Sequence, residues 1–188
     1  MEEISCAASY TAPGPYPEVR AEGKNRRYGQ AILSNVGGGV SEMGAVAQYL
    51  YGRVTQEGRP EVAECLGGIA MVEMRHLSIF SQLALQLGED PRLWSPFRGG
   101  RRYWTPEYLR YPRRLDQLLR YAIEEERAAI QKYNQQLLWI RDGNVMENLR
   151  RVIADEEVHV EVLTRLLNSY CPAPGAMAPQ NATPQCPI

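Results

Sequence analysis

The sequence contains few histidines and no close pair of cysteines. His76 and His159 are the only histidines among 188 residues, and the four cysteines form no Cys-x-x-Cys pair. The missing pair excludes a rubredoxin-type iron site and a zinc ribbon. No run of about 18 apolar residues occurs, so we expect no membrane-spanning segment. The formal net charge of −1 gives no reason to expect nucleic acid or an anionic membrane as a partner.

The ends of the chain differ in composition from its centre. Pro13, Pro15 and Pro17 exclude a helix near the N-terminus, and this region lacks the basic start and apolar stretch of a secretory signal. We therefore expect a cytoplasmic protein with reduced thiols. The composition predicts an extended arm over 1–25, one helical domain over 26–170 and a Pro-rich tail over 171–188.

Four stretches between the tails carry apolar residues at steps of three and four, the period of amphipathic helices. We expect helices over about 27–52, 60–88, 114–142 and 144–171. Gly37, Gly38 and Gly39 either lie within one continuous first helix or break it, with Ser41 capping a shorter one; we favour the continuous helix.

The connections between the predicted helices differ in length. The first and third connections are short, whereas the second, over about 89–113, is long for a helix–helix loop. Two antiparallel helical hairpins joined by one long crossover make an all-α, ferritin-like four-helix bundle.

Each histidine lies three residues after a glutamate. The two segments are Glu73-Met-Arg-His76 and Glu156-Glu-Val-His159. On a helix, residues three apart share a face, so each segment presents a carboxylate and an imidazole to one point.

A third glutamate lies about thirty residues upstream of each segment. Glu42 precedes the first segment by 31 residues and Glu126 precedes the second by 30. Tyr49 and Tyr133 each follow that upstream glutamate by seven residues. The bundle is thus a duplicated hairpin, and packing about a pseudo-two-fold axis brings both sets of residues to one centre.

The four glutamates lie on helix faces that are otherwise apolar. Burying four bare carboxylates there would cost many kcal/mol, whereas two divalent cations would neutralise them. Carboxylate and imidazole ligands suit iron or manganese, and the absence of thiolates argues against copper(I) and structural zinc. We therefore predict two Fe or Mn ions held by six ligands, which are Glu42, Glu73, His76, Glu126, Glu156 and His159.

The predicted ligands have distinct roles. Glu73 and Glu156 would bridge the two metals, whereas Glu42 and Glu126 would each bind one. The second ring nitrogen of each histidine would be held by an acceptor. Tyr49 and Tyr133 either donate hydrogen bonds to the ligands or are ordinary core tyrosines; both interpretations stay open.

The pattern resembles the ferritin-like superfamily, specifically its rubrerythrin and manganese-catalase branches, over about 26–169. Beyond the ligand motifs, the strings SEMGAVAQYLYG, IAMVEMRHLSIFSQLALQLGEDPR and RVIADEEVHVEVLTRLL are similar to small bacterial proteins of these branches. The resemblance implies a dinuclear iron or manganese centre between four helices that acts on hydrogen peroxide or dioxygen.

Two departures separate the sequence from rubrerythrins. Rubrerythrins carry a further glutamate where Ala129 stands here, and a rubredoxin domain that we do not expect in this protein. Manganese catalases need no external electron donor, and their tails wrap neighbouring subunits. The resemblance to them therefore implies a homo-oligomer.

These observations predict a dinuclear iron or manganese oxidoreductase that consumes hydrogen peroxide, as a catalase or a rubrerythrin-like peroxidase. Three alternatives stay open at this stage. They are a ferritin-like metal oxidation and storage protein, an oxygen-dependent oxidase or hydroxylase of an organic substrate, and a metal-free interaction module.

Overall fold

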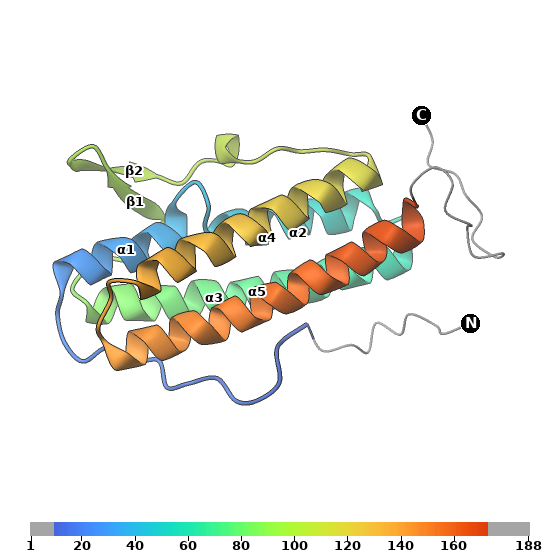
Figure 1. Cartoon of the computed structure of the whole chain (residues 1–188). Coiled ribbons are helices and arrows are strands. Elements are labelled where there is room, and N and C mark those ends of the chain that lie inside the picture. Colours follow the sequence, from blue (N-terminus) through green and yellow to red (C-terminus); the bar gives the residue numbers. More distant parts are fainter. Residues whose placement is uncertain (1–9, 173–188) are drawn as a thin grey trace.

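The computed structural model describes residues 10–172, which form five α-helices, a two-stranded hairpin and a 3-10 helix (Figure 1). Residues 1–9 of the predicted arm and 173–188 of the predicted tail lie outside the described residues. The helices are α1 (Arg26–Gly37), α2 (Glu42–Thr55), α3 (Pro60–Gln86), α4 (Leu115–Leu137) and α5 (Gly143–Tyr170). No helix in the described part of the chain is long and apolar enough to cross a bilayer.

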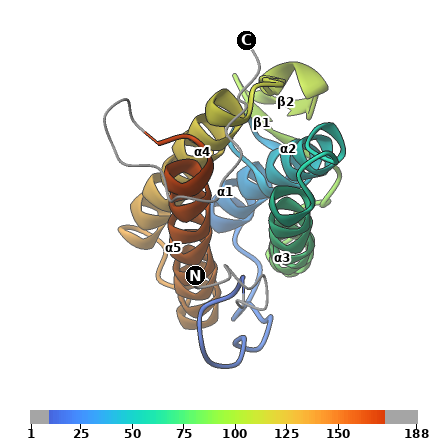
Figure 2. The same cartoon turned by 90° about the vertical axis from the view of Figure 1, so that its right-hand side faces the viewer.

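Two helical hairpins pack against each other, which confirms the predicted ferritin-like bundle. Helices α2 and α3 form one hairpin and α4 and α5 form the other, and α1 lies against α3 beyond the end of α2. Viewed along its axis in Figure 2, the bundle places α3 beside α5 and α2 beside α4. Four helices therefore surround one central axis, as the duplicated sequence predicts.

The prediction of one continuous first helix is wrong. Helix α1 ends at Gly37, and α2 begins at Glu42 with Ser41 as its N-cap, whose hydroxyl accepts a hydrogen bond from Gly44 N. Each helical glycine costs about 1 kcal/mol relative to alanine. A helix through this stretch would therefore be weak, and competing contacts can break it. The break places Glu42 in the first turn of α2.

Distant residues stabilise the break. Lys132 on α4 donates hydrogen bonds to the carbonyls of Ser34 and Val40, at 2.9 and 2.8 Å, and so satisfies groups that a helix end exposes. The crossover packs closely against Gly37, where a Cβ atom would lie 2.6 Å from the backbone nitrogen of Trp94. Both contacts come from parts of the chain far away in sequence.

The predicted third helix is too long at its C-terminus. Helix α4 ends at Leu137, and residues 138–142 connect it to α5. Asp142 is the N-cap of α5 and accepts a hydrogen bond from Val145 N at 3.1 Å. Aspartate at this position favours a new helix start over the continuation of the preceding helix.

The long crossover contains regular structure that the sequence analysis did not predict. Strands β1 (Trp94–Phe97) and β2 (Gly100–Tyr103) pair antiparallel, and the 3-10 helix η1 (Pro106–Tyr108) follows. The hairpin lies over α1, and η1 contacts α2 (Figure 1). The crossover therefore covers one side of the bundle.

The apolar core consists of two clusters of buried residues. One contains Leu33, Phe80 and Leu149, and the other contains Leu66, Leu119 and Leu163. Along α3, Glu73 and His76 lie between the two clusters. The polar centre of the bundle is thus sealed by apolar side chains on both sides.

Candidate metal centre

Six buried side chains from four helices meet between the two apolar clusters. Donor atoms within 4.8 Å of one another form two overlapping groups. Every predicted ligand belongs to them: the first group is Glu42, Glu73, His76 and Glu156, and the second is Glu73, Glu126, Glu156 and His159. None of these residues is more than 3% exposed.

The two shared glutamates lie between the two imidazoles. Glu73 lies 3.3 Å from Nδ1 of His76 and 2.9 Å from Nδ1 of His159. Glu156 lies 3.3 Å and 2.8 Å from the same two nitrogens. A carboxylate that faces both imidazoles is placed to bridge two cations.

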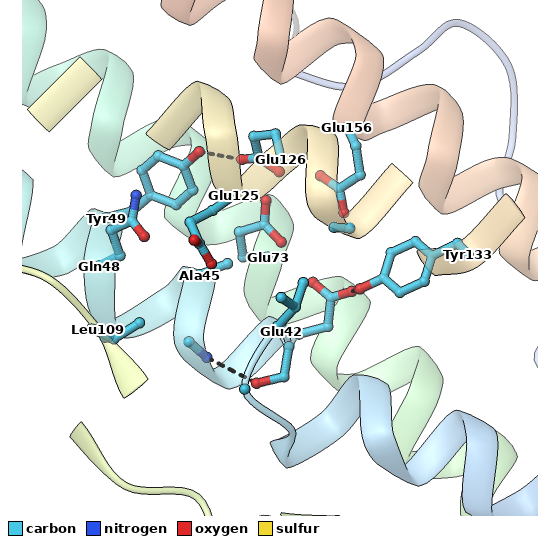
Figure 3. A pocket seen from close by; sticks show the side chains of 15 residues that line it. Glu42, Ala45, Gln48, Tyr49, Glu73, Leu109, Glu125, Glu126, Tyr133 and Glu156 are labelled. Carbon is cyan, nitrogen blue, oxygen red and sulfur yellow. Dashed lines mark hydrogen bonds between the residues drawn. The ribbon is translucent and has the colours of Figure 1, made fainter. Parts of the chain in front are cut away.

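The other two glutamates each face one imidazole. Glu42 lies 3.8 Å from Nδ1 of His76, and Glu126 lies 3.6 Å from Nδ1 of His159. Each half of the duplicated sequence thus supplies one shared and one terminal carboxylate. Figure 3 shows the four carboxylates gathered in one pocket.

Each histidine turns its Nδ1 atom inward and its Nε2 atom outward. His76 Nε2 lies 3.1 Å from Asp155 Oδ2, and His159 Nε2 lies 3.0 Å from the carbonyl oxygen of Tyr10. A carbonyl only accepts hydrogen bonds, so His159 Nε2 carries a proton. In the neutral imidazole the lone pair is then on Nδ1, which faces the carboxylates.

An acceptor behind each imidazole was expected from the sequence, but neither Asp155 nor the Tyr10 carbonyl was predicted. Asp155 precedes Glu156 in a run of three acids, and nothing in the run separates the buried Asp155 from the exposed Glu157. Asp155 pairs with His76 on α3, and its position on α5 gives no sequence signal for that contact. Tyr10 acts through its backbone, which leaves no signal in the sequence.

The two tyrosines connect the halves of the site. Tyr49 on α2 donates its hydroxyl to Oε1 of Glu126 on α4, and Tyr133 on α4 donates to Oε1 of Glu42 on α2 (Figure 3). Each terminal glutamate thus accepts a hydrogen bond from the tyrosine of the opposite hairpin.

Comparison with known proteins gives a family and a fold. Residues 40–167 match the family model described as Rubrerythrin. The chain belongs to the rubrerythrin family. Two crystal structures of KatB, a manganese catalase from Anabaena, share the fold with a TM-score of 0.76 at 22% identity. The matches cover 92% and 93% of this chain and 87% and 86% of the KatB chains, and no curated protein matches the sequence.

Protons accumulate on the cluster when no cation is present. Burial, followed by the charges of Glu73 and Glu156, raises the pKa of Glu42 well above its ordinary value. Burial and the same two charges raise the pKa of Glu126 to about 8. Carboxylates in a dry interior thus hold protons until another positive charge replaces them.

At the two imidazoles and at Glu73, neighbouring charges and hydrogen bonds outweigh the effect of burial on the pKa. Burial opposes charge on His76 and His159, but the surrounding carboxylates outweigh it and raise the pKa of both imidazoles well above its usual range. Burial likewise opposes ionisation of Glu73, and the two imidazoles overcome it and lower its pKa. The cluster therefore requires positive charge at its centre.

The residues fit two divalent cations. Although His159 Nδ1 lies 2.9 Å away, Oε1 of Glu73 accepts no hydrogen bond of good geometry from any residue of the described chain. A buried oxygen without a donor is costly and is suited to a metal ligand. Four carboxylates and two imidazoles are the donor set of iron or manganese, and two divalent ions balance four carboxylates.

A small pocket leads to the centre between α2 and α4. The four glutamates of the cluster and both tyrosines line it (Figure 3). Its other lining residues include Gln48, Leu109, Glu125 and Ala129. Its free volume of about 20 Å³ suits one water-sized molecule. Ala129 contributes a small side chain to the wall of this pocket.

Proposed function

We propose that the protein is a dimetal carboxylate enzyme that consumes hydrogen peroxide and uses two iron or manganese ions. The small pocket that ends on the carboxylate cluster carries the proposal. Hydrogen peroxide is close to water in size and polarity, so a volume of about 20 Å³ suits it. An organic substrate for an oxidase or hydroxylase needs an apolar pocket many times larger.

Six residues would hold the ions. Glu73 and Glu156 would bridge, Glu42 and His76 would complete one site, and Glu126 and His159 would complete the other. When bound, two such ions supply reversible exchange of two electrons with hydrogen peroxide. Six protein ligands for two ions would leave coordination positions for hydrogen peroxide.

The remaining side chains keep the ligands in place and the site dry. The hydroxyls of Tyr49 and Tyr133 hold the terminal carboxylates, and Asp155 and the Tyr10 carbonyl hold the imidazoles. The two apolar clusters exclude water, which strengthens the electrostatic interactions at the centre. At the pocket wall, Gln48 and Glu125 offer hydrogen bonds to an entering molecule.

Catalase chemistry, which needs no external reductant, suits the protein better than peroxidase chemistry. The further glutamate of rubrerythrins is replaced by Ala129, and the sequence contains no Cys-x-x-Cys pair for a rubredoxin-type iron. The expected homo-oligomer and cytoplasmic location belong to the same proposal. Light scattering on the full chain tests the first of these.

The test combines elemental analysis with a peroxide-decay assay on one purified sample. The proposal expects two iron or manganese ions per chain and oxygen evolution without a reductant. Peroxide loss only in the presence of an electron donor would assign peroxidase chemistry. Bound metal with no peroxide loss under either condition would contradict the proposal and favour metal storage or oxygen chemistry.

A further inference from the structure

The N-terminal arm passes directly behind both imidazoles. Residues 10–16 run along the outside of the bundle between α3 and α5 (Figure 2). The carbonyl of Tyr10 accepts a hydrogen bond from Nε2 of His159. Ala12 N and the hydroxyl of Tyr16 each donate to Asp155 at 2.7 Å, and Asp155 in turn holds Nε2 of His76. One short segment therefore reaches both histidines from outside the helices.

Specific contacts seat the arm at each end. The ring of Tyr10 packs against α3 at Gly68, where a Cβ atom would come within 2.1 to 2.7 Å of three ring carbons. The ring of Tyr16 lies near two guanidinium groups, 4.6 Å from that of Arg75 and 4.2 Å from that of Arg151. These cation–π contacts and the glycine fix where the arm can lie.

The anchoring extends to Asp155 itself. Arg151 donates to the carbonyl of Ala12 at 2.8 Å and lies 3.2 Å from Asp155 Oδ1. The aspartate thus accepts from the arm, from its own helix and from His76 at the same time. A carboxylate held from several directions orients the imidazole that donates to it.

This arrangement controls which nitrogen of each ring faces the cluster. The outward Nε2 atoms have acceptors, so they carry the protons and the Nδ1 lone pairs face inward. If the arm moved away, His159 Nε2 would face water, and its ring would lose the contact that selects tautomer and rotation. His76 would keep Asp155, but Asp155 would lose two of its donors.

We propose that residues 10–16 of the arm are part of the metal centre, where Tyr10 and Tyr16 act as positioning residues that set metal affinity through His159 and His76. The inference rests on the metal site of the proposed function but not on its peroxide chemistry. The arm therefore closes the outer face of the site, on the side opposite the crossover.

Two variants test the two contacts separately. Gly68→Ala places a methyl group where the Tyr10 ring now lies, so the ring and the Tyr10 carbonyl must move. Gly67→Ala on the same helix is the control, because the nearest atoms to its methyl group belong to the flexible end of Arg53. Tyr16→Phe removes the hydroxyl that holds Asp155. Tyr28→Phe is its control because it removes a tyrosine hydroxyl that accepts one hydrogen bond, from Arg141 N in the connection after α4.

The first measurement is the affinity for Mn(II), by competition with a chelator, on the full-length protein. We expect Gly68→Ala and Tyr16→Phe to weaken binding by about 10- to 100-fold, the range for loss of a partner of a metal-ligating histidine. The controls should stay within about twofold of the unaltered protein. Circular dichroism of each metal-free variant shows whether it folds, and if Gly68→Ala does not, Tyr16→Phe decides the result.

The second measurement follows the imidazole protons by NMR of the Zn(II)-loaded protein. We expect two Nε2–H signals in the unaltered protein. Gly68→Ala should abolish the His159 signal by exchange with water and preserve that of His76, and Tyr16→Phe should shift only the His76 signal. A purely structural role of the arm would lower stability without this selectivity.

The outcomes separate the two proposals. Affinities and signals equal to those of the controls would overturn the role of the arm. An unaltered protein that binds no metal would overturn the metal site itself, before any variant is made. Two bound metals without peroxide consumption would contradict the proposed reaction and leave the test of the arm intact.

Discussion

Tyr133 on α4 donates its hydroxyl to Oε1 of Glu42 on α2, so a tyrosine of one hairpin holds a terminal carboxylate of the other. Tyr49 and Glu126 repeat this relationship in reverse. All four groups are at most 3% exposed. The duplicated hairpins are therefore linked through the candidate ligands themselves.

Removing one of these hydroxyls should weaken metal binding. Tyr133→Phe leaves Oε1 of Glu42 without its donor, and we expect Mn(II) affinity to fall by about 10-fold. Chelator competition measures the effect, with Tyr51→Phe as the control because Tyr51 bonds only the carbonyl of Tyr111 at the surface. Equal affinities for the two variants would show that Tyr133 serves only packing.

Bridging and terminal glutamates should differ in their effect on metal content. Glu73 faces both imidazoles, so Glu73→Gln should reduce the metal content per chain well below that of a variant that lacks one terminal glutamate. Glu42→Gln and Glu126→Gln each remove a ligand from one site, and we expect about one ion per chain to remain. Elemental analysis after gel filtration measures this, and the same loss for all three variants would refute the assignment.

Metal binding should release protons. At pH 7 the metal-free protein holds protons on Glu126, whose pKa is about 8, on Glu42 and on both imidazoles, whose pKa values are also raised. Cations displace these protons, so affinity should rise with pH up to about 8. A pH indicator in weakly buffered solution detects the release. Binding without proton release would be inconsistent with this electrostatic description.

The same shift predicts how the metal-free protein responds to pH. The folded state binds the Glu126 proton more tightly than the unfolded chain, so this stabilisation is complete below the ordinary pKa of 4.5. It is lost as the pH rises to about 8, and the raised pKa values of the two imidazoles act in the same direction. The melting temperature of the metal-free protein should therefore fall as the pH rises across this range. The melting temperature of the metal-bound protein should not show this fall.

Filling the pocket should block turnover while leaving metal in place. Ala129→Leu adds three carbon atoms to the wall of a pocket with about 20 Å³ of free volume. We expect kcat/KM for peroxide to fall at least about 10-fold, with overpacking costing about 1–3 kcal/mol of stability. Oxygen evolution and elemental analysis on the same sample check both parts. Full activity in this variant would mean that peroxide enters by another route.

The break between α1 and α2 should depend on one glycine more than on its neighbour. A methyl group on Gly37 meets the backbone of Trp94, whereas one on Gly39 meets nothing within 4 Å. Gly37→Ala should therefore lower the melting temperature relative to Gly39→Ala. Equal melting temperatures would mean that the crossover backbone at Trp94 moves aside to accommodate the methyl group.

The sequence predicted the parts of the protein that depend on periodicity. The long apolar faces of α3 and α5 fix both the bundle and the positions of Glu73, His76, Glu156 and His159, because a buried carboxylate stands out on an apolar face. The duplication then predicted the partners on α2 and α4.

What the sequence did not predict depends on contacts between distant segments. Lys132 and Trp94 contact the break after Gly37 from other parts of the chain, and these contacts decide against the continuous helix that we favoured from the sequence. The burial of Asp155 depends on the arm, and the carbonyl of Tyr10 carries no side-chain signal. Such features follow from packing and not from spacing.

The most direct test of the central claim is an anomalous difference map from crystals of the full-length protein loaded with Mn(II). We predict two peaks per chain between Glu73 and Glu156, one beside Nδ1 of His76 and the other beside Nδ1 of His159. A single peak, or peaks outside this cluster, would contradict the account.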